Sequence, residues 1–282
     1  MWFLGEARAG YAPALDLEKG IEHQKRMEKP RQMPQRPIVL IPARMASTRL
    51  PGKPLADIGG EPMIVHVWRR AMESGIGPVA VACDGEEIAA AVKKVGGEAV
   101  LTKPDHPSGS DRLWEALQIL EAKTQKGQGG FDAVINVQGD LPVLDPGAIR
   151  AAFGLLRDPD VDIGTLAVAI KNEEDKRAEH IAKAVIEMPE GGKRGHALYF
   201  SRLPVPSGAG AMYHHIGLYA YRREALARFV ATPPAQLELR EKLEQLRALA
   251  LGMRIEVAVI EAVPLGVDTP ADLEVARKLL VR

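Results

Sequence analysis

The chain has 282 residues, of which 46% are hydrophobic and 26% are charged, and its 37 lysines and arginines balance its 37 aspartates and glutamates. This length accommodates one large α/β domain or two modest ones, with a buried core that needs no disulfide or metal. The balanced charge argues against a nucleic-acid partner, which would require a basic face. No apolar run approaches the ~20 residues that span a membrane, which argues against a membrane partner.

The first 36 residues do not have the pattern of a folded domain. A short apolar start is interrupted by Glu6 and Arg8 before the core of a signal peptide could form. The stretch from Glu18 to Arg36 is charged and contains prolines, so it has little to bury. We predict that residues 1–36 are a disordered extension, or reflect the choice of start site, and that residues 37–282 form the folded domain.

The first predicted strand, Ile38–Ile41, runs directly into a loop of small residues that carries three cations, Arg44, Arg49 and Lys53. In an open α/β sheet the ligand crevice lies beyond the carboxyl ends of the strands, where backbone N–H groups can converge on phosphate oxygens. The three cations would offset a charge of about −4 on a triphosphate. For this segment alone, the alternative is a basic surface loop that is stiffened by prolines.

Two familiar phosphate-binding motifs are absent from this junction. The P-loop pattern G-x-x-x-x-G-K-[ST] fails because residue 47 is Ser47 and because Gly52-Lys53 is followed by Pro54, which has no hydroxyl for magnesium. The dinucleotide fingerprint G-x-G-x-x-G does not follow the strand either. The sequence therefore predicts neither a P-loop ATPase nor an NAD-dependent enzyme.

Strand and helix patterns alternate through the first half of the domain. The predicted strands are nearly continuous in apolar residues and lie at Ile38–Ile41, Val79–Ala82, Ala99–Leu101 and Ala133–Val137. The predicted helices lie at Met63–Ser74, Glu86–Val95, Ser110–Ala122 and Ala148–Leu156. This alternation predicts a doubly wound, mostly parallel α/β sheet. Cys83, the only cysteine, ends an apolar run, which predicts a buried, non-catalytic thiol in a reducing compartment.

The pattern changes between residues 163 and 222. Turn-rich stretches without long helices separate extended segments at Gly164–Ile170, Lys183–Glu187, His196–Phe200 and His215–Tyr221. We interpret this region as a strand-rich insertion that widens the sheet and closes over a second substrate. The remaining predicted elements are helices at Arg223–Ala231 and Leu239–Leu251, a strand at Ile255–Ile260 and a last helix after Thr269-Pro270.

Two carboxylates lie at predicted strand ends that are far apart in the sequence. Asp140 follows the strand Ala133–Val137, and Asp268 lies in a turn just before the last helix. In triphosphate chemistry Mg²⁺ binds through one or two carboxylates together with phosphate oxygens and water, and this pair would satisfy that demand. Considered separately, Asp268 could instead cap the last helix, and Asp140 could be an ordinary turn residue.

Seven short segments carry a signature when they are taken in order along the chain: Ile41–Pro54, Asp105–Arg112, Asn136–Asp140, Ala197–Arg202, His215–Tyr219, Leu243–Arg247 and Gly266–Pro270. They are similar to segments of the 3-deoxy-manno-octulosonate cytidylyltransferase family, whose members are also called CMP-Kdo synthetases. The resemblance covers about residues 37–280. It implies a fold of the nucleotide-diphospho-sugar transferase kind, in which the strand-rich insertion forms the sugar side and the dimer contacts.

The resemblance implies an enzyme, a nucleotidyltransferase that transfers CMP from CTP to the anomeric 2-hydroxyl of Kdo and releases diphosphate. It places this reaction in lipopolysaccharide biosynthesis, in the cytoplasm of a Gram-negative cell. It further implies Mg²⁺ as the cofactor, CTP and Kdo as small-molecule substrates, and a homodimer. In-line attack on the α-phosphorus needs positioning and charge neutralisation more than covalent catalysis, which suits cations and a metal.

The resemblance also implies roles for individual residues. The catalytic residues would be Lys53, Asp140 and Asp268, and the two aspartates would bind the metal. The nucleotide would contact Ala43, Arg44, Ser47, Lys53, Ser110, Asp111, Arg112 and Asp140. The sugar would contact Gln138, Arg202, His215, Tyr219, Glu244 and Gln245. Strand alternation puts His214 and His215 on opposite faces, so only one of them faces a shared pocket, and the motif selects His215.

The sequence departs from the family at two places. Leu141 stands where many members have a glutamate after the metal-binding aspartate. The stretch Leu203–Met212 is rich in proline, glycine and alanine, whereas the corresponding loop of familiar members is charged and contains tryptophan. Both departures concern the sugar side and leave the nucleotide end intact.

Other functions remain open at the level of sequence. The same fold could act on 8-amino-Kdo or sialic acid, or could serve as a non-catalytic nucleotide-binding regulator. The presence of both Asp140 and Asp268 argues against the regulator. An inverting glycosyltransferase is a further alternative, although no Asp-x-Asp metal motif stands at the expected strand end.

Overall fold

The computed structural model describes residues 31–123 and 130–280, and the chain from Met33 onward forms one compact unit. Most of the predicted disordered extension, residues 1–30, lies outside the described residues. The backbone N–H groups of Gln35 and Arg36 each donate to the carboxylate of Asp132 at 2.8 Å. Contacts with the folded unit therefore begin just before the predicted domain boundary at residue 37.

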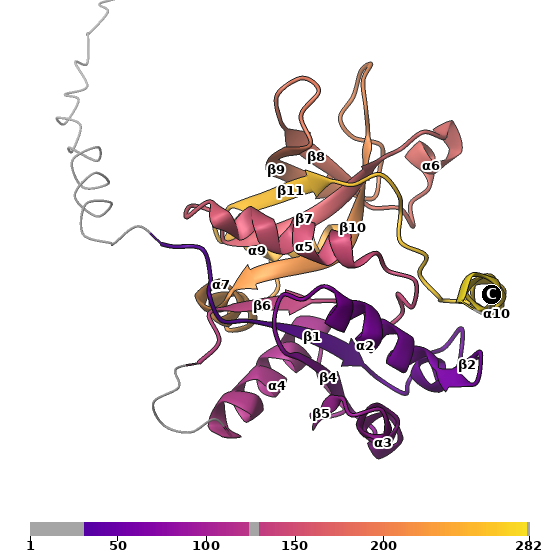
Figure 1. The fold of residues 1–282 in the computed structure, drawn as a ribbon. Coiled ribbons are helices and arrows are strands. Elements are labelled where there is room, and N and C mark those ends of the chain that lie inside the picture. The colour runs from indigo at the N-terminus through magenta and orange to yellow at the C-terminus, as the bar shows by residue number, and fades with distance from the viewer. Residues whose placement is uncertain (1–30, 124–129, 281–282) are drawn as a thin grey trace, which may run out of the picture. The chain divides into compact units, whose positions relative to one another are not determined.

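A nine-stranded sheet with the order β5-β4-β1-β6-β10-β7-β11-β9-β8 runs through this unit (Figure 1). Its strands are β1 (Pro37–Ala43), β4 (Val79–Cys83), β5 (Glu98–Leu101), β6 (Ala133–Asn136), β7 (Ile163–Ala169), β8 (Lys183–Glu187), β9 (Arg194–Ser201), β10 (Tyr213–Arg222) and β11 (Ile255–Val259). A separate short ribbon pairs β2 (Asp57–Ile58) with β3 (Glu61–Pro62). All the predicted strands are confirmed, with small differences at their ends.

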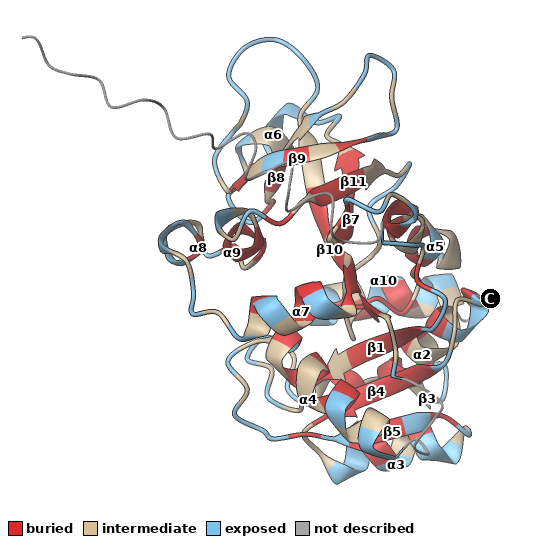
Figure 2. Ribbon diagram, turned by 90° about the vertical axis from the view of Figure 1, so that its left-hand side faces the viewer, coloured by how far each residue is buried: buried red, intermediate tan, exposed pale blue. Residues whose placement is uncertain are grey.

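Helices cover both faces of the sheet. On β1, Val39 and Ile41 belong to one apolar cluster with helices α2 (Met63–Glu73), α3 (Glu86–Lys94) and α5 (Pro146–Gly154). The alternate residues Ile38 and Leu40 belong to a second cluster with α4 (Gly109–Lys123), α7 (Arg223–Val230) and α9 (Gln245–Ala250). The strands are therefore buried on both sides, as Figure 2 shows for β1 and β4, and this explains their continuous apolar sequence.

The last helix stands apart from these two layers. Helix α10 (Pro270–Leu280) packs against β2 in a smaller apolar cluster that contains Ile58, Met63 and Leu273. Figure 1 shows α10 beside β2, at the edge of the unit next to α2. Within residues 31–123 and 130–280, none of the helices combines the length and the apolar character needed to cross a membrane.

Only part of the sheet is parallel. β1 pairs parallel with β4 and β6, β4 with β5, and β7 with β11. By contrast, β8, β9 and β10 pair antiparallel with each of their neighbours. The prediction of a mostly parallel sheet is wrong for the half that contains residues 163–222. A parallel neighbour needs a long crossover, and this region has only the five-residue α6 (Glu173–Arg177), so its consecutive strands return antiparallel.

The predicted single helix at Leu239–Leu251 is also wrong. Two short helices, α8 (Gln236–Glu241) and α9, occupy this part of the chain. Lys242 between them has a φ of 55°, a left-handed conformation that a right-handed helix does not continue through. The next residue, Leu243, is 6% exposed. The helix therefore stops so that the chain can bury Leu243 before α9 begins.

The predicted buried thiol is confirmed. Cys83 ends β4 and is fully buried, and its Sγ is 3.8 Å from the carbonyl oxygen of Val100. Burial raises the pKa of Cys83 to about 11, so the thiolate that a nucleophile needs does not form near neutral pH.

Candidate functional site

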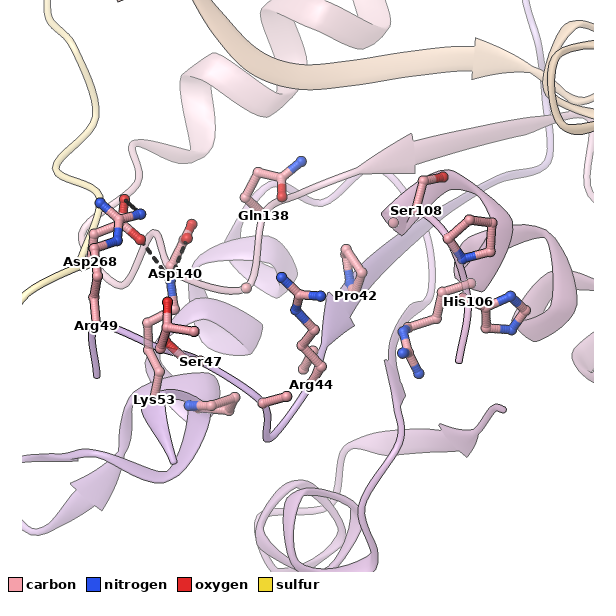
Figure 3. Close-up of a pocket in the computed structure, with 18 residues that line it drawn as sticks. Pro42, Arg44, Ser47, Arg49, Lys53, His106, Ser108, Gln138, Asp140 and Asp268 are labelled. Atoms are coloured by element: carbon pink, nitrogen blue, oxygen red, sulfur yellow. Dashed lines mark hydrogen bonds and ion pairs between the residues drawn. The ribbon is translucent and has the colours of Figure 1, made fainter. Parts of the chain in front are cut away.

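A pocket of about 520 Å³ opens at the carboxyl ends of β1 and β6 (Figure 3), the edge at which open α/β sheets bind ligands. It is walled by the loop after β1, the segment before α4 and the turn after β6. The predicted site residues that line it are Ala43, Arg44, Ser47, Lys53, Arg112, Gln138, Asp140 and Asp268. Those that lie outside its lining are Ser110, Asp111, Arg202, His215, Tyr219, Glu244 and Gln245.

The loop after β1 is held in place from β4. The backbone N–H of Met45 donates to Oδ1 of Asp84 at 3.0 Å, and Asp84 directly follows β4. At the far end of the loop, Gly52 has a φ of 67°, a left-handed conformation that glycine adopts without strain. These contacts fix where Lys53 leaves the backbone. Sequence reasoning missed Asp84, although it follows its strand much as Asp140 follows β6.

Lys53 lies between the two predicted metal ligands. Its Nζ is 2.8 Å from Oδ2 of Asp140 and 3.0 Å from Oδ1 of Asp268. Nη2 of Arg49 is 3.1 Å from the other oxygen of Asp268. Burial by itself lowers the pKa of Lys53, but the two carboxylates outweigh burial and raise this pKa above its ordinary value. Side chains that are 87 and 215 positions from Lys53 in the sequence thus form one charged cluster with it.

The oxygen donors at this end of the pocket fit Mg²⁺ in kind. Asp140 and Asp268 offer carboxylate oxygens, and Mg²⁺ binds through one or two carboxylates together with phosphates and water. Across residues 31–123 and 130–280, no group of three or more His, Cys, Asp or Glu side chains could hold a metal. A Mg²⁺ ion at Asp140 and Asp268 would therefore need further ligands from a bound triphosphate and water.

Gly139 brings Asp140 into the pocket through a close backbone approach. A Cβ at position 139 would lie 2.6 Å from the carbonyl oxygen of Pro42. We expect Gly139→Ala to lower the free energy of unfolding by about 1–3 kcal/mol, because neither backbone segment can move aside cheaply. Turnover should fall as well, since the turn that carries Asp140 must shift. Urea unfolding followed by circular dichroism and an assay of turnover measure the two effects.

Gly154→Ala is the matched control for this prediction. A Cβ at position 154 meets nothing within 4 Å, and the φ of −59° is helical. Alanine there should leave stability unchanged or raise it slightly. If Gly139→Ala and Gly154→Ala unfolded at the same urea concentration, the close approach at Gly139 would carry no energetic weight.

The segment before α4 forms a braced wall of the pocket. Arg112 is buried, and its guanidinium donates to Oγ1 of Thr102 at 2.6 Å. It also donates to the carbonyl oxygens of Lys103 at 3.1 Å and Pro104 at 3.3 Å. The side chain predicted to contact nucleotide therefore also fixes the backbone that leads into the wall.

Two residues of this wall were missed by sequence reasoning. Figure 3 shows His106 and Ser108 at the end of the pocket away from the charged cluster. Glu115 accepts from Nε2 of His106 at 2.5 Å and from the backbone N–H of Lys103 at 2.9 Å, so it holds the wall from α4. His106 and Ser108 belong to the segment Asp105–Arg112 that carried the family signature, and this was the available signal.

His215, Tyr219 and Gln245 form a second cluster. Nε2 of His215 is 3.0 Å from Oγ1 of Thr165, and its Nδ1 is 3.3 Å from Nε2 of Gln245. The ring of Tyr219 lies 5.5 Å from the imidazole. The Thr165 hydroxyl donates to main-chain carbonyls, so it accepts from His215. This network assigns a neutral imidazole with its proton on Nε2.

Two hydrogen bonds lie between the pocket and the second cluster, which we call the sugar-side cluster after the predicted role of its residues. Nε2 of Gln138, which lines the pocket, donates to the carbonyl oxygen of Gly217 at 3.0 Å. Oγ of Ser110 donates to Oε2 of Glu244 at 3.2 Å, just before Gln245 begins α9. Burial raises the pKa of Glu244, although Ser108, the charge of Arg247 and Ser110 oppose the shift. The pocket is therefore connected to β10 through Gln138, while Ser110 of α4 contacts Glu244 from outside the pocket lining.

The buried imidazole of His215 makes stability depend on pH. Burial lowers its pKa to about 3, with a smaller contribution from His214. An unfolded chain has a histidine pKa of about 6.5, so between pH 6.5 and 3 the unfolded state binds more protons. The stabilisation is fully present above pH 6.5 and is lost as the pH falls towards 3. We expect His215→Gln to lose less stability than the wild type on acidification, by up to about 1.4 kcal/mol per pH unit.

Urea unfolding at pH 7 and pH 5 measures this difference. The carboxylates of the two proteins titrate alike, so their contribution cancels when the two slopes are compared. Parallel losses of stability in the wild type and His215→Gln would contradict the neutral, buried state of His215.

Arg202 is bound to main-chain groups. Its guanidinium donates to the carbonyl oxygens of Glu179, Glu241 and Lys242, each at 3.2 Å. Its own backbone N–H donates to the Glu241 carboxylate at 3.0 Å. Arg202 therefore ties the end of β9 to the residues around α8, and its contact with the sugar stays a prediction.

Comparisons of sequence identify relatives along most of the chain. The sequence model of one protein family, described as Cytidylyltransferase, matches residues 38–255. A protein of Paramagnetospirillum magneticum named 3-deoxy-manno-octulosonate cytidylyltransferase is 61% identical over 244 residues, which cover 86% of this chain and 97% of the relative. A protein of the same name from Rhodospirillum centenum is 60% identical over 247 residues, which cover 88% of this chain and 94% of the relative.

Two solved structures share the fold. CMP:2-keto-3-deoxy-manno-octonic acid synthetase complexed with CTP superposes with a TM-score of 0.78 at 38% identity, covering 88% of this chain and 99% of the other. A 4-diphosphocytidyl-2C-methyl-D-erythritol synthase from Anaerococcus prevotii has a TM-score of 0.56 at 12% identity, with the same coverage of both chains. The second likeness concerns the fold alone.

Proposed function

The chain belongs to the cytidylyltransferase family of 3-deoxy-manno-octulosonate cytidylyltransferases, and on that premise we propose how its site transfers CMP from CTP to Kdo and releases diphosphate. The observation that carries the proposal is the position of Lys53. Lys53 lies between Asp140 and Asp268. The loop that carries Arg44 and Arg49 lines the same pocket. Cations for a triphosphate and carboxylates for a metal thus meet at one sheet edge.

The two ends of the pocket differ: Lys53, Asp140 and Asp268 form one end, and His106 and Ser108 lie at the other. Lys53 and Arg49 at the charged end, with Arg44 between that end and the wall of His106, would hold the triphosphate. The braced wall with His106 and Ser108 receives the nucleoside. A nucleotide oriented in this way directs its α-phosphorus towards Gln138 and the sugar-side cluster, so the sugar hydroxyl attacks opposite the departing diphosphate.

Asp140 and Asp268 are the residues that would hold Mg²⁺. When bound, Mg²⁺ would neutralise phosphate charge and lower the pKa of a hydroxyl group that it contacts. The two carboxylates would orient the ion, and the turn at Gly139 sets the position of Asp140. No further side-chain base is needed in this proposal, and His215 is a poor candidate because its pKa of about 3 makes it a weak base.

The sugar-side cluster would bind Kdo. Tyr219, Glu244 and Gln245 would supply donors and acceptors for sugar hydroxyls, His215 would orient Gln245 through its Nδ1, and Arg202 would supply a cation for the carboxylate. Tyr219 remains protonated, because burial raises its pKa well above the ordinary value, and so its hydroxyl can donate. Arg202→Ala should then act mainly on the KM for Kdo.

The wider setting follows from the same premise. We place the reaction in the cytoplasm, where it activates Kdo for lipopolysaccharide biosynthesis, and we propose that the enzyme is a homodimer. In this proposal the strand-rich region at 163–222 supplies the dimer contacts. Light scattering of the purified protein measures its mass in solution, and a monomer at micromolar concentration would contradict the dimer.

A coupled assay of diphosphate release tests the function. The purified protein with CTP, Kdo and Mg²⁺ should release diphosphate and form CMP-Kdo, which mass spectrometry detects. Parallel reactions with 8-amino-Kdo and sialic acid rank the sugar acids by kcat/KM. CTP binding without diphosphate release from any sugar acid would identify a regulator in place of an enzyme.

A further inference from the structure

The carboxylate pair is already neutralised by cations of the protein. Asp140 and Asp268 both contact the Lys53 ammonium, at 2.8 and 3.0 Å, and Arg49 contacts Asp268 at 3.1 Å. Two negative charges therefore face two positive charges. In this arrangement the electrostatic attraction that a bare divalent cation would feel is reduced.

Lys53 is held firmly in this position. Its side chain is only 17% exposed, whereas that of Arg49 is 64% exposed. Its backbone N–H donates to the carbonyl oxygen of Leu50 at 3.1 Å, and the buried Pro54 follows it. The ammonium therefore lies largely shielded from solvent between the carboxylates, and a metal must displace it to bind both of them.

The protein offers too few ligands to compensate for that displacement. In the part of the chain that the structure describes, no third acidic, histidine or cysteine side chain completes a metal site with Asp140 and Asp268. Mg²⁺ with one or two carboxylates takes its other ligands from phosphates and water. A triphosphate changes the balance, because its charge of about −4 can draw the Lys53 ammonium away and can bring the ion with it.

We propose that Lys53 acts as the internal counter-ion of the Asp140–Asp268 pair, which closes the pair to free divalent cations until a nucleoside triphosphate takes over the lysine. This inference rests on the proposed function for the identity of the triphosphate and adds an order of binding to it. The metal enters with or after the nucleotide. The enzyme thereby avoids holding Mg²⁺ in a pocket without substrate.

Binding of Mn²⁺, measured by electron paramagnetic resonance, tests the inference without any turnover. Without nucleotide, the wild type should bind Mn²⁺ weakly, and Lys53→Met should bind it about tenfold more tightly or better, because the competing charge is gone. A CTP analogue with a methylene group between its α and β phosphates should restore tight Mn²⁺ binding to the wild type. A variant that merely disturbs the pocket would lose affinity, which is the opposite direction.

Three further variants keep the result specific. Lys53→Arg retains the charge and should bind free Mn²⁺ as weakly as the wild type. Adding Asp140→Asn to Lys53→Met should abolish the gained affinity. Lys93→Met removes an exposed lysine from the end of α3, outside the lining of the pocket, and should leave Mn²⁺ binding unchanged. Thermal unfolding of each variant verifies that it is folded.

Equal Mn²⁺ affinities of the wild type and Lys53→Met without nucleotide would overturn the counter-ion role, while the diphosphate assay would still decide the proposed function separately. If Mn²⁺ bound neither the wild type nor Lys53→Met, even with the CTP analogue, two assignments would be overturned. These are the counter-ion role of Lys53 and the placement of the metal at Asp140 and Asp268.

Discussion

Asp140→Asn is expected to lower kcat by about two orders of magnitude or more, while the midpoint of thermal unfolding stays close to that of the wild type. Asparagine keeps the shape of the side chain but removes the charge that faces Lys53 at 2.8 Å and that would hold the metal. The turn itself should persist, because the backbone carbonyl of Asp140 still accepts from the N–H of Val267 at 2.9 Å. Steady-state release of diphosphate over a range of Mg²⁺ concentrations measures the effect.

Asp145→Asn is the matched control. Asp145 caps α5, and its Oδ1 accepts from the N–H of Gly147 at 2.8 Å. Asparagine is also a good N-cap, so this variant should keep both stability and kcat. Asp268→Asn should behave like Asp140→Asn. If Asp140→Asn turned over at a rate near that of the wild type, Asp140 would not be part of the reaction.

Arg247→Met is expected to lower the free energy of unfolding by about 3–5 kcal/mol, because it leaves the carboxylate of Glu238 buried without its cation. The two side chains are only 8% and 10% exposed, and Nη2 of Arg247 is 2.6 Å from Oε1 of Glu238. The guanidinium also lies 4.6 Å from the ring centroid of Phe229. This pair joins α8 to α9, and α9 begins with Gln245 of the sugar-side cluster. Urea unfolding measures the loss.

A double variant separates the unpaired charge from the lost packing. Glu238→Met combined with Arg247→Met should recover part of the stability, because no buried charge remains without a partner. Recovery should be incomplete, since Oε2 of Glu238 also accepts from the backbone N–H of Ala235 at 2.9 Å. A double variant that is less stable than Arg247→Met alone would argue against the unpaired charge as the cause.

Arg69→Met provides the surface comparison. Arg69 pairs with Glu61 on side chains that are 43% and 35% exposed, so water already screens both charges. Its loss should cost about 1 kcal/mol or less. Similar losses for Arg69→Met and Arg247→Met would show that burial does not set the energy of these pairs.

Local patterns were sufficient for most elements. The run Ile38–Ile41 is apolar at every position because helices cover both faces of the sheet, and the sequence alone revealed both the strand and its burial. The family resemblance is confirmed by relatives at about 60% identity. The break at Lys242 was missed because nothing in the local pattern of residues 239–251 opposes a continuous helix. In the structure Lys242 adopts a left-handed conformation, and Leu243 packs in an apolar cluster with residues from distant parts of the chain, such as Ile38.

The antiparallel direction of the strands in residues 163–222 was missed for a similar reason. Each segment there could be recognised as a strand, but pairing is made with residues far away in the chain. Tyr219 pairs with Asn136 of β6 and with Thr165 of β7. The residues next to Tyr219 in the sequence do not indicate either partner. The absence of long helices between these strands was the signal for antiparallel returns.

The sequence by itself determined the strands, the loop of cations after β1, the two candidate metal-binding carboxylates and the family to which the chain belongs, because each depends on residue types at short spacing. It did not determine the place of Asp268, which lies just before α10 and does not directly follow a strand. Only the tertiary structure decided that the ammonium of Lys53 stands between Asp140 and Asp268, that Asp84 and Glu115 brace the walls of the pocket, and that Arg202 is bound to main-chain carbonyls. These are contacts between side chains on separate elements, and their distances follow from how the whole sheet packs.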